Sequence, residues 1–149
     1  MQERFASELK AAMKAGDKRR VGTIRMIMAA LKDREIEARS QGKTLSEEDI
    51  LALLQKMTKS RKESQEIYEK AGRLDLSAQE AEEISIINSF LPQQLSEPEV
   101  EAAIAAAIAE TGASSIKEMG KVVGALKAHY AGRMDFAKAA ARVKAMLGG

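Results

Sequence analysis

Apolar residues recur at every third or fourth position along almost the whole chain, and glycines interrupt this pattern at intervals. Phe5, Leu9 and Met13, for example, share one face of an α-helix, and Gly16 then provides a signal for its end. No segment alternates polar and apolar residues as a half-buried β-strand does. Alanine, leucine, methionine, glutamate and lysine, which all favour helix or tolerate it well, are abundant. The pattern therefore predicts an all-α protein.

Residues with the chemistry of helix caps mark the boundaries of the predicted helices. Ser46 with Asp49, and Ser77 with Glu80, have the spacing of a capping box. The predicted N-caps after the first helix are Asp17, Ser46, Ser77, Ser96, Ser114 and Asp135, and the predicted terminating glycines are Gly16, Gly42, Gly72, Gly112 and Gly132.

Two prolines predict where the chain divides. Pro92 disfavours helix at the residue before it, and Pro98 suits the first turn of a new helix. We therefore predict an N-terminal helical domain of about four helices over residues 1–91, a linker over 92–96 and a C-terminal three-helix bundle over 97–149. The helices of the bundle are expected at about 97–111, 115–130 and 136–147.

The residue types present leave little provision for self-contained catalysis. There is no cysteine and a single histidine, His129, so zinc sets, a cysteine nucleophile and a Ser-His-Asp triad are poorly provided for. We predict no catalytic residues, no cofactor and no metal. No segment approaches the ~20 consecutive apolar residues of a membrane span, and the N-terminus lacks the apolar core of a signal peptide. We expect a cytoplasmic protein without a membrane partner.

Charge is unevenly divided along the chain. Residues 1–45 carry a net charge of +5, residues 46–111 carry −8 and residues 112–149 carry +5. Either the basic ends fold against the acidic middle and neutralise it, or one or both ends bind a polyanion. Charge alone favours the first interpretation.

One cationic row is visible in the second predicted helix. Lys18, Arg25, Lys32 and Arg39 are spaced by seven residues, so they form a stripe that drifts only ~20° per heptad. A solvated stripe is the interpretation that we favour, and an anion-binding stripe is the alternative.

Two glycines lie four residues apart in the predicted helix 115–130, where each costs ~1 kcal/mol relative to alanine. Either Gly120 and Gly124 let an alanine-rich neighbour, 100–109 or 137–141, approach closely, or they leave bare backbone for a ligand such as a phosphate–sugar chain. We favour close packing, which does not exclude the second use. The candidate nucleic-acid-binding residues are Lys117, Gly120, Lys121, Gly124, Lys127, Arg133, Lys138 and Arg142. Because Tyr130 and Phe136 fall on the predicted core side, folded RNA suits this patch better than unpaired bases.

Four motifs carry a resemblance to a known family. They are R-K-E-S at 61–64, Y-E-K-A-G-R at 68–73, F-L-P-Q-Q-L-S at 90–96 and M-G-K-V-V-G-A-L at 119–126. Together they closely resemble the YqeY family over essentially the whole chain. The resemblance implies an all-helical protein whose C-terminal part is similar to the tail domain of the B subunit of the aspartyl/glutamyl-tRNA amidotransferase.

In that enzyme the tail domain helps to hold tRNA, while the chemistry lies elsewhere. The resemblance therefore implies tRNA, and an aminoacyl-tRNA synthetase or amidotransferase subunit, as partners, together with the family label of carbon–nitrogen ligase with glutamine as amido-N-donor. The sequence contains no glycine-rich phosphate loop and no activated nucleophile. We expect an RNA-binding accessory module; the alternatives are a protein-interaction adaptor without RNA binding or catalysis, and a free-standing amidotransferase-type ligase.

Overall fold

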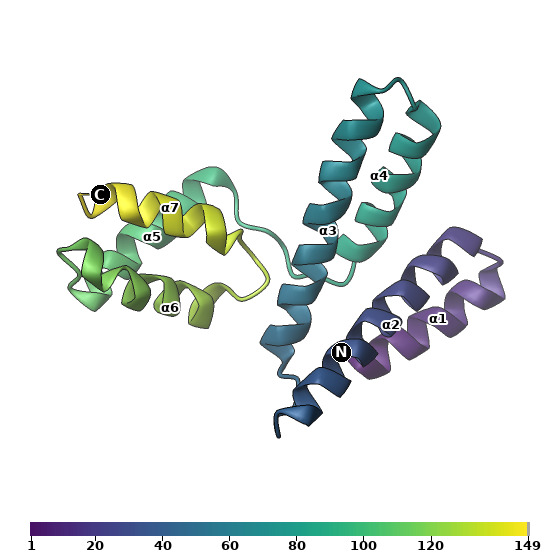
Figure 1. The fold of residues 1–149 in the computed structure, drawn as a ribbon, viewed down its shortest axis with the longest axis horizontal. Coiled ribbons are helices and arrows are strands. Elements are labelled where there is room, and N and C mark those ends of the chain that lie inside the picture. Colours follow the sequence, from purple (N-terminus) through teal and green to yellow (C-terminus); the bar gives the residue numbers. More distant parts are fainter. Residues whose placement is uncertain (149) are drawn as a thin grey trace. The chain divides into compact units, whose positions relative to one another are not determined.

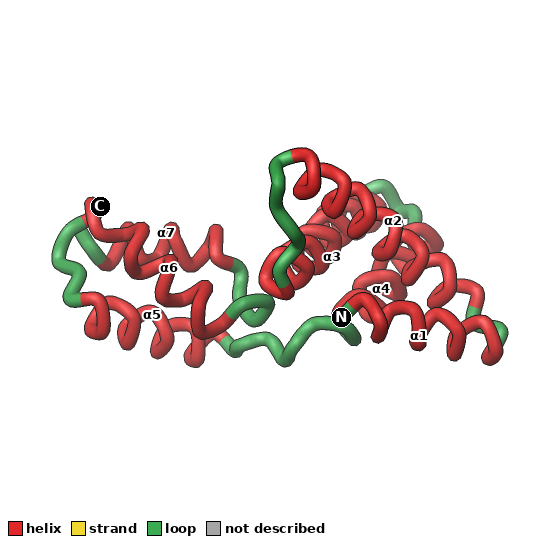
Figure 2. The backbone as a smooth tube through the Cα atoms, turned by 90° about the horizontal axis from the view of Figure 1, so that it is seen from below, coloured by secondary structure: helices red, strands yellow, loops and turns green. Residues whose placement is uncertain are grey.

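The computed structural model describes residues 1–148 and is all-α, as predicted. Its seven α-helices are joined by short loops and turns, and no strand occurs in those residues (Figures 1 and 2). The helices are α1 (Gln2–Ala15), α2 (Lys18–Ser40), α3 (Glu47–Lys70), α4 (Leu74–Asn88), α5 (Glu97–Thr111), α6 (Met119–Tyr130) and α7 (Phe136–Met146), and a short 3-10 helix, Ile116–Glu118, precedes α6.

Contacts divide the chain into two compact units, Met1–Leu91 and Pro92–Gly149. The first unit consists of two antiparallel helical hairpins, α1–α2 and α3–α4, with α2 packed against α4 (Figure 1). The second is a three-helix bundle in which α6 packs against both α5 and α7. Each unit has its own apolar core. That the units are independent folding domains with the predicted 92–96 linker stays a prediction, and Gly149 lies outside the described residues.

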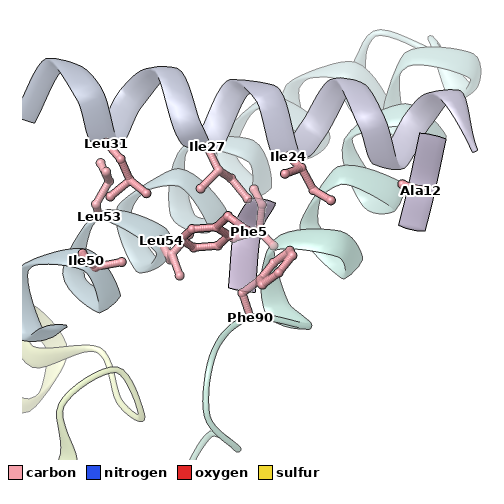
Figure 3. Close-up of a cluster of buried hydrophobic side chains, with 10 residues drawn as sticks. Phe5, Ala12, Ile24, Ile27, Leu31, Ile50, Leu53, Leu54 and Phe90 are labelled. Carbon is pink, nitrogen blue, oxygen red and sulfur yellow. The ribbon is translucent and has the colours of Figure 1, made fainter. Parts of the chain in front are cut away.

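The core of the first unit joins all four of its helices through α2. Ile24, Ile27 and Leu31 point from one side of α2 toward side chains of α3 and toward two phenylalanines (Figure 3). Phe5 of α1 and Phe90, which follows α4, are out of contact with water, and their ring centroids lie 4.8 Å apart. The segment after α4 is therefore fixed to the start of the chain.

Two arginines cover the outer side of that aromatic pair. The guanidinium carbons of Arg4 and Arg20 lie 5.0 Å and 5.5 Å from the centroid of the Phe90 ring. Arg4 also donates a hydrogen bond to the carbonyl of Ser89, and Arg20 pairs with Glu8. Cation–π contacts of this kind add to the hydrophobic burial of the ring.

The second core is built from the facing sides of α5, α6 and α7. It contains Ile104, Val122, Leu126 and Val143, all without exposed surface. Val123, next to Val122 on α6, is only half-buried.

Most of the predicted caps form. Ser46 and Asp49 make a capping box, and so do Ser96 and Glu99. In both boxes the backbone N–H of the serine donates to the carboxylate and lowers its pKa below the ordinary value. Asp17 and Asp135 also cap the helices predicted for them.

Two predicted caps are wrong. Helix α4 begins three residues before Ser77, which is buried inside the helix and donates to a carboxylate oxygen of Glu69. Ser114 caps no helix; its backbone N–H and hydroxyl instead lie 3.5 Å from the Glu118 carboxylate. In both cases the serine hydroxyl contacts a glutamate side chain and does not cap the helix that the spacing predicted.

The segment predicted as a linker is bound to the second unit. The Leu95 N–H donates to the carbonyl of Arg133, and the Gln94 side chain donates to the carbonyl of Gly132. Arg133 returns a hydrogen bond of 2.9 Å to the carbonyl of Gln93. Three consecutive residues, 93–95, are thus held to the turn between α6 and α7.

We expect Phe90→Ala to lower the free energy of unfolding by about 3–5 kcal/mol, because it removes a buried ring and leaves a cavity between four helices. Urea denaturation followed by circular dichroism would measure the change. Ile67→Ala is the matched control, since Ile67 is 64% exposed and its loss should alter stability by less than about 0.5 kcal/mol. Equal effects of the two substitutions would contradict the packing described here.

Candidate nucleic-acid interface

The side of α6 that faces away from the bundle core carries the two glycines. Gly120, Gly124 and Ala128 are spaced by four residues and are all exposed, while Val122 and Leu126 occupy the opposite, buried side. We call the exposed set Lys117, Gly120, Lys121, Gly124, Lys127 and Ala128 the α6 face. The centre of this face therefore carries no side-chain atoms beyond the methyl group of Ala128.

The glycines do not serve close helix packing, so the interpretation favoured by the sequence is wrong. A Cβ atom added at Gly120 or Gly124 would meet no atom within 4 Å. The alanine-rich helices α5 and α7 pack against the other side of α6, through its apolar residues. Gly120 also lies in the first turn of α6, because the preceding residues form the 3-10 helix. Gly124, in the helix interior, has no packing contact that offsets its cost.

Three lysines border this bare backbone. Lys117, Lys121 and Lys127 are exposed, and none of them forms an ion pair or a side-chain hydrogen bond in residues 1–148. From Met119 to Met134 the sequence contains no aspartate or glutamate. The α6 face therefore carries positive charge that its own helix does not neutralise.

Two of the other three candidate residues have structural partners. Arg133 binds the carbonyl of Gln93, and its guanidinium carbon lies 5.9 Å from the Tyr130 ring centroid. Arg142 pairs with Glu97 and Glu101 of α5. Lys138, one turn before Arg142 on α7, shares the side that Arg142 turns toward α5. The structure thus gathers five of the eight candidates on the α6 face.

His129 also lies outside any arrangement suited to catalysis. Its Nε2 atom is 3.7 Å from a carboxylate oxygen of Glu110, and both side chains are more than half exposed. The pair joins the end of α6 to α5 at the surface.

A second polar cluster lies between α3 and α4. Glu83 is buried and pairs with Arg61 at 3.1 Å, and Arg61 also donates to the carbonyl of Met57. One carboxylate oxygen of Glu80 is buried without a hydrogen-bond partner. Burial, and then the charge of Glu83, raise the pKa of Glu80, while Arg61 opposes the shift. Arg61 belongs to the R-K-E-S motif, but its partner Glu83 is 22 residues away, so no local pattern indicated the pair.

A hollow of about 340 Å³ opens between the end of α2 and the start of α3. Leu45 and Leu53 contribute apolar surface, and side chains of both signs, including Arg34, Glu37 and Lys43, surround it. In residues 1–148 no group of three or more histidine, cysteine or carboxylate side chains is placed to hold a metal ion, and no helix there is long and apolar enough to cross a membrane.

The family model described as Yqey-like protein matches residues 2–147. The chain belongs to the YqeY-like family. The motif at 61–64 therefore supplies the arginine of the buried pair in a YqeY-like protein, and the motif at 119–126 supplies both glycines of the α6 face.

Two curated proteins are similar to this YqeY-like chain. One, from Lachancea thermotolerans, is called altered inheritance of mitochondria protein 41, mitochondrial; it is 39% identical over 105 residues, which are 69% of this chain and 55% of that protein. The other is an uncharacterised protein of Schizosaccharomyces pombe, 29% identical over 96 residues, which are 64% of this chain and 76% of that protein. The chain thus spans little more than half the length of the Lachancea protein.

We expect Gly124→Ala to raise the free energy of unfolding by about 0.5–1 kcal/mol, because alanine favours helix and the added methyl group enters open space. Gly112→Ala is the matched control. Gly112 has φ +66°, where an added Cβ is strained, so the same substitution there should destabilise by about 1–2 kcal/mol. Urea denaturation of the full chain would measure both. Destabilisation by Gly124→Ala would mean that another segment fills the space.

We expect Glu80→Gln to stabilise the fold at pH 7. The raised pKa of Glu80 means that folding disfavours its ionised form, and glutamine removes that charge. The gain should shrink as the pH falls through the raised pKa, because the wild-type carboxyl then becomes protonated. Denaturation at several pH values from 7 to 4 would show this trend. Glu82→Gln is the control, since that exposed carboxylate pairs with Arg19 at the surface. Destabilisation by Glu80→Gln at neutral pH would show that its charge has a stabilising partner.

Proposed function

We propose that this YqeY-like chain binds a folded RNA, with tRNA as the first candidate, through the α6 face. The observation that carries the proposal is the open space at Gly120 and Gly124 beside three lysines without partners. Gly124 lowers helix stability without a gain in packing, which supports a use of the bare backbone as a binding surface.

The chemistry of the α6 face suits a phosphate–sugar backbone. Lysine ammonium groups contact phosphates as point charges, and they provide affinity that depends on salt and little on sequence. The exposed residues of helix α6 are all glycine, alanine, lysine or histidine. Tyr130 and Phe136 pack against the second core, so they are not placed as stacking platforms for unpaired bases. These features favour RNA recognised by shape.

The resemblance of the C-terminal part to the amidotransferase tail domain supports tRNA as the first candidate. On that basis we propose an accessory role in an aminoacylation or amidotransferase complex, and we assign no catalytic residue. The family label of carbon–nitrogen ligase would then describe the reaction of the complex rather than of this chain. A cytoplasmic site of action stays a prediction, because the name of the Lachancea relative includes mitochondrial.

The test is binding of tRNA by fluorescence anisotropy at several salt concentrations. The informative variant replaces Lys117, Lys121 and Lys127 by glutamine and leaves Arg133 in place, because that arginine holds the 93–95 segment. If the three lysines each contact a phosphate, the slope of log K against log salt concentration should become shallower by roughly two to three units.

Lys10, Lys14 and Lys62 provide the matched control. All three are exposed and lie in the first unit, so their replacement by glutamine changes the net charge equally. Gly124→Leu adds a steric test: it should leave the fold intact and weaken binding, since the side chain covers the centre of the α6 face. Equal loss in both triple variants would indicate non-specific attraction, and absence of binding by the wild type at low salt would refute the proposal.

A further inference from the structure

Helix α2 has an exposed face with a different character. Its centre is formed by Gly22, Met26, Ala29 and Ile36, all exposed, and one edge is formed by the row Lys18, Arg25, Lys32 and Arg39. We call these eight residues the α2 face. The opposite side of the same helix carries Ile24, Ile27 and Leu31, which are buried in the first core.

The centre of the α2 face is largely exposed. Ile36 is 57% exposed and Met26 is 39% exposed, although the latter's sulfur receives a hydrogen bond from Arg61. A Cβ atom added at Gly22 would meet nothing within 4 Å, so this glycine, like Gly124, has no packing role. The side of α2 that faces away from the first core thus exposes two large apolar side chains, Met26 and Ile36.

The cationic edge is unpaired, in contrast to neighbouring cations of the same helix. Arg19 and Arg20 pair with Glu82 and Glu8. Among the described residues, none of the four cations of the edge forms an ion pair or a side-chain hydrogen bond. Two carboxylates lie near this row: Asp33 is within the central strip, four residues after Ala29, and Glu35 is three residues after Lys32. The positive charge of this edge is therefore available to a partner.

The spacing of the row fits another helix. Positions seven apart on an α-helix are separated by about 10.5 Å along the axis, and a partner helix with carboxylates at the same spacing can stay in register over several turns. Burial of exposed Met26 and Ile36 against an apolar side chain is favourable, whereas a phosphate backbone offers no apolar surface to cover them. The α6 face has no such strip along the helix itself, so the two faces favour different kinds of partner.

We propose that the α2 face docks an amphipathic helix of a partner protein, one that carries a row of carboxylates beside an apolar stripe. The carboxylates pair with Lys18, Arg25, Lys32 and Arg39, and the apolar stripe covers Ala29 and Ile36. Gly22 lets the partner approach closely at one end. The contact is separate from the α6 face and does not depend on RNA binding.

The test places a photo-reactive amino acid at Ala29, at the centre of the α2 face, and irradiates the protein in an RNase-treated extract of its source cells. Mass spectrometry of the adduct identifies the contacted segment. The matched control carries the same amino acid at Ala6, which is exposed on α1. We expect an adduct specific to position 29, in a segment that is helical by circular dichroism and carries carboxylates at heptad spacing.

A synthetic peptide of that segment then gives an affinity by fluorescence anisotropy. Arg25→Glu with Lys32→Glu should weaken it at least tenfold, while Lys10→Glu with Lys62→Glu, an equal charge change elsewhere in the first unit, should leave it unchanged. Circular dichroism would confirm that each variant folds, and the milder Arg25→Gln with Lys32→Gln replaces the reversal if it does not.

Several results would overturn the proposal. They are no adduct above the Ala6 control, an adduct that is RNA, an adduct with a second copy of the chain, a segment without the acidic row, or an affinity indifferent to Arg25 and Lys32. The glutamine variant of Lys117, Lys121 and Lys127 should leave the adduct at position 29 intact, so failure of RNA binding and failure of helix docking are distinguishable.

Discussion

The contact between Phe5 and Phe90 closes the first unit of the chain. The two rings lie 4.8 Å apart and are excluded from water, which joins the first helix to the residues that follow the fourth. Helix α2 packs its apolar side onto this pair and onto α3 and α4, so its position follows from the same core. Because that side is buried, the other side of α2 faces outward. The row Lys18, Arg25, Lys32 and Arg39 is therefore exposed to solvent.

The second unit follows the same physical rule on a smaller scale. Helix α6 contributes its apolar side to a core between α5 and α7, and the glycines and lysines of its other side remain exposed. Small helical units bury one side of each helix and leave the other free, because they contain too few helices to surround any of them. The exposed faces of α2 and α6 differ in chemistry, since exposed Met26 and Ile36 lie only on the first.

A buried ion pair links the two helices of the α3–α4 hairpin. Arg61 and Glu83 pair between α3 and α4, while Glu80 keeps one oxygen buried without a partner. Breaking such a pair is costly because it leaves one charge unpaired, although forming it adds little to stability. The Arg61–Glu83 pair therefore links α3 to α4, and its loss should cost more than its formation gains.

Helices and most caps could be predicted because they depend on residues three or four positions apart, as in the capping boxes of Ser46 with Asp49 and Ser96 with Glu99. The sequence by itself thus determined an all-α chain, most of its helix boundaries and, through its motifs, its family. The tertiary structure decided that Gly124 faces open space, that Ser77 lies inside a helix, and that Arg133 and Arg142 bind Gln93 and Glu97. These outcomes depend on residues that are distant in the sequence or on what lies beyond a helix face. Helical periodicity determines which residues share a face, but only packing determines which face meets water.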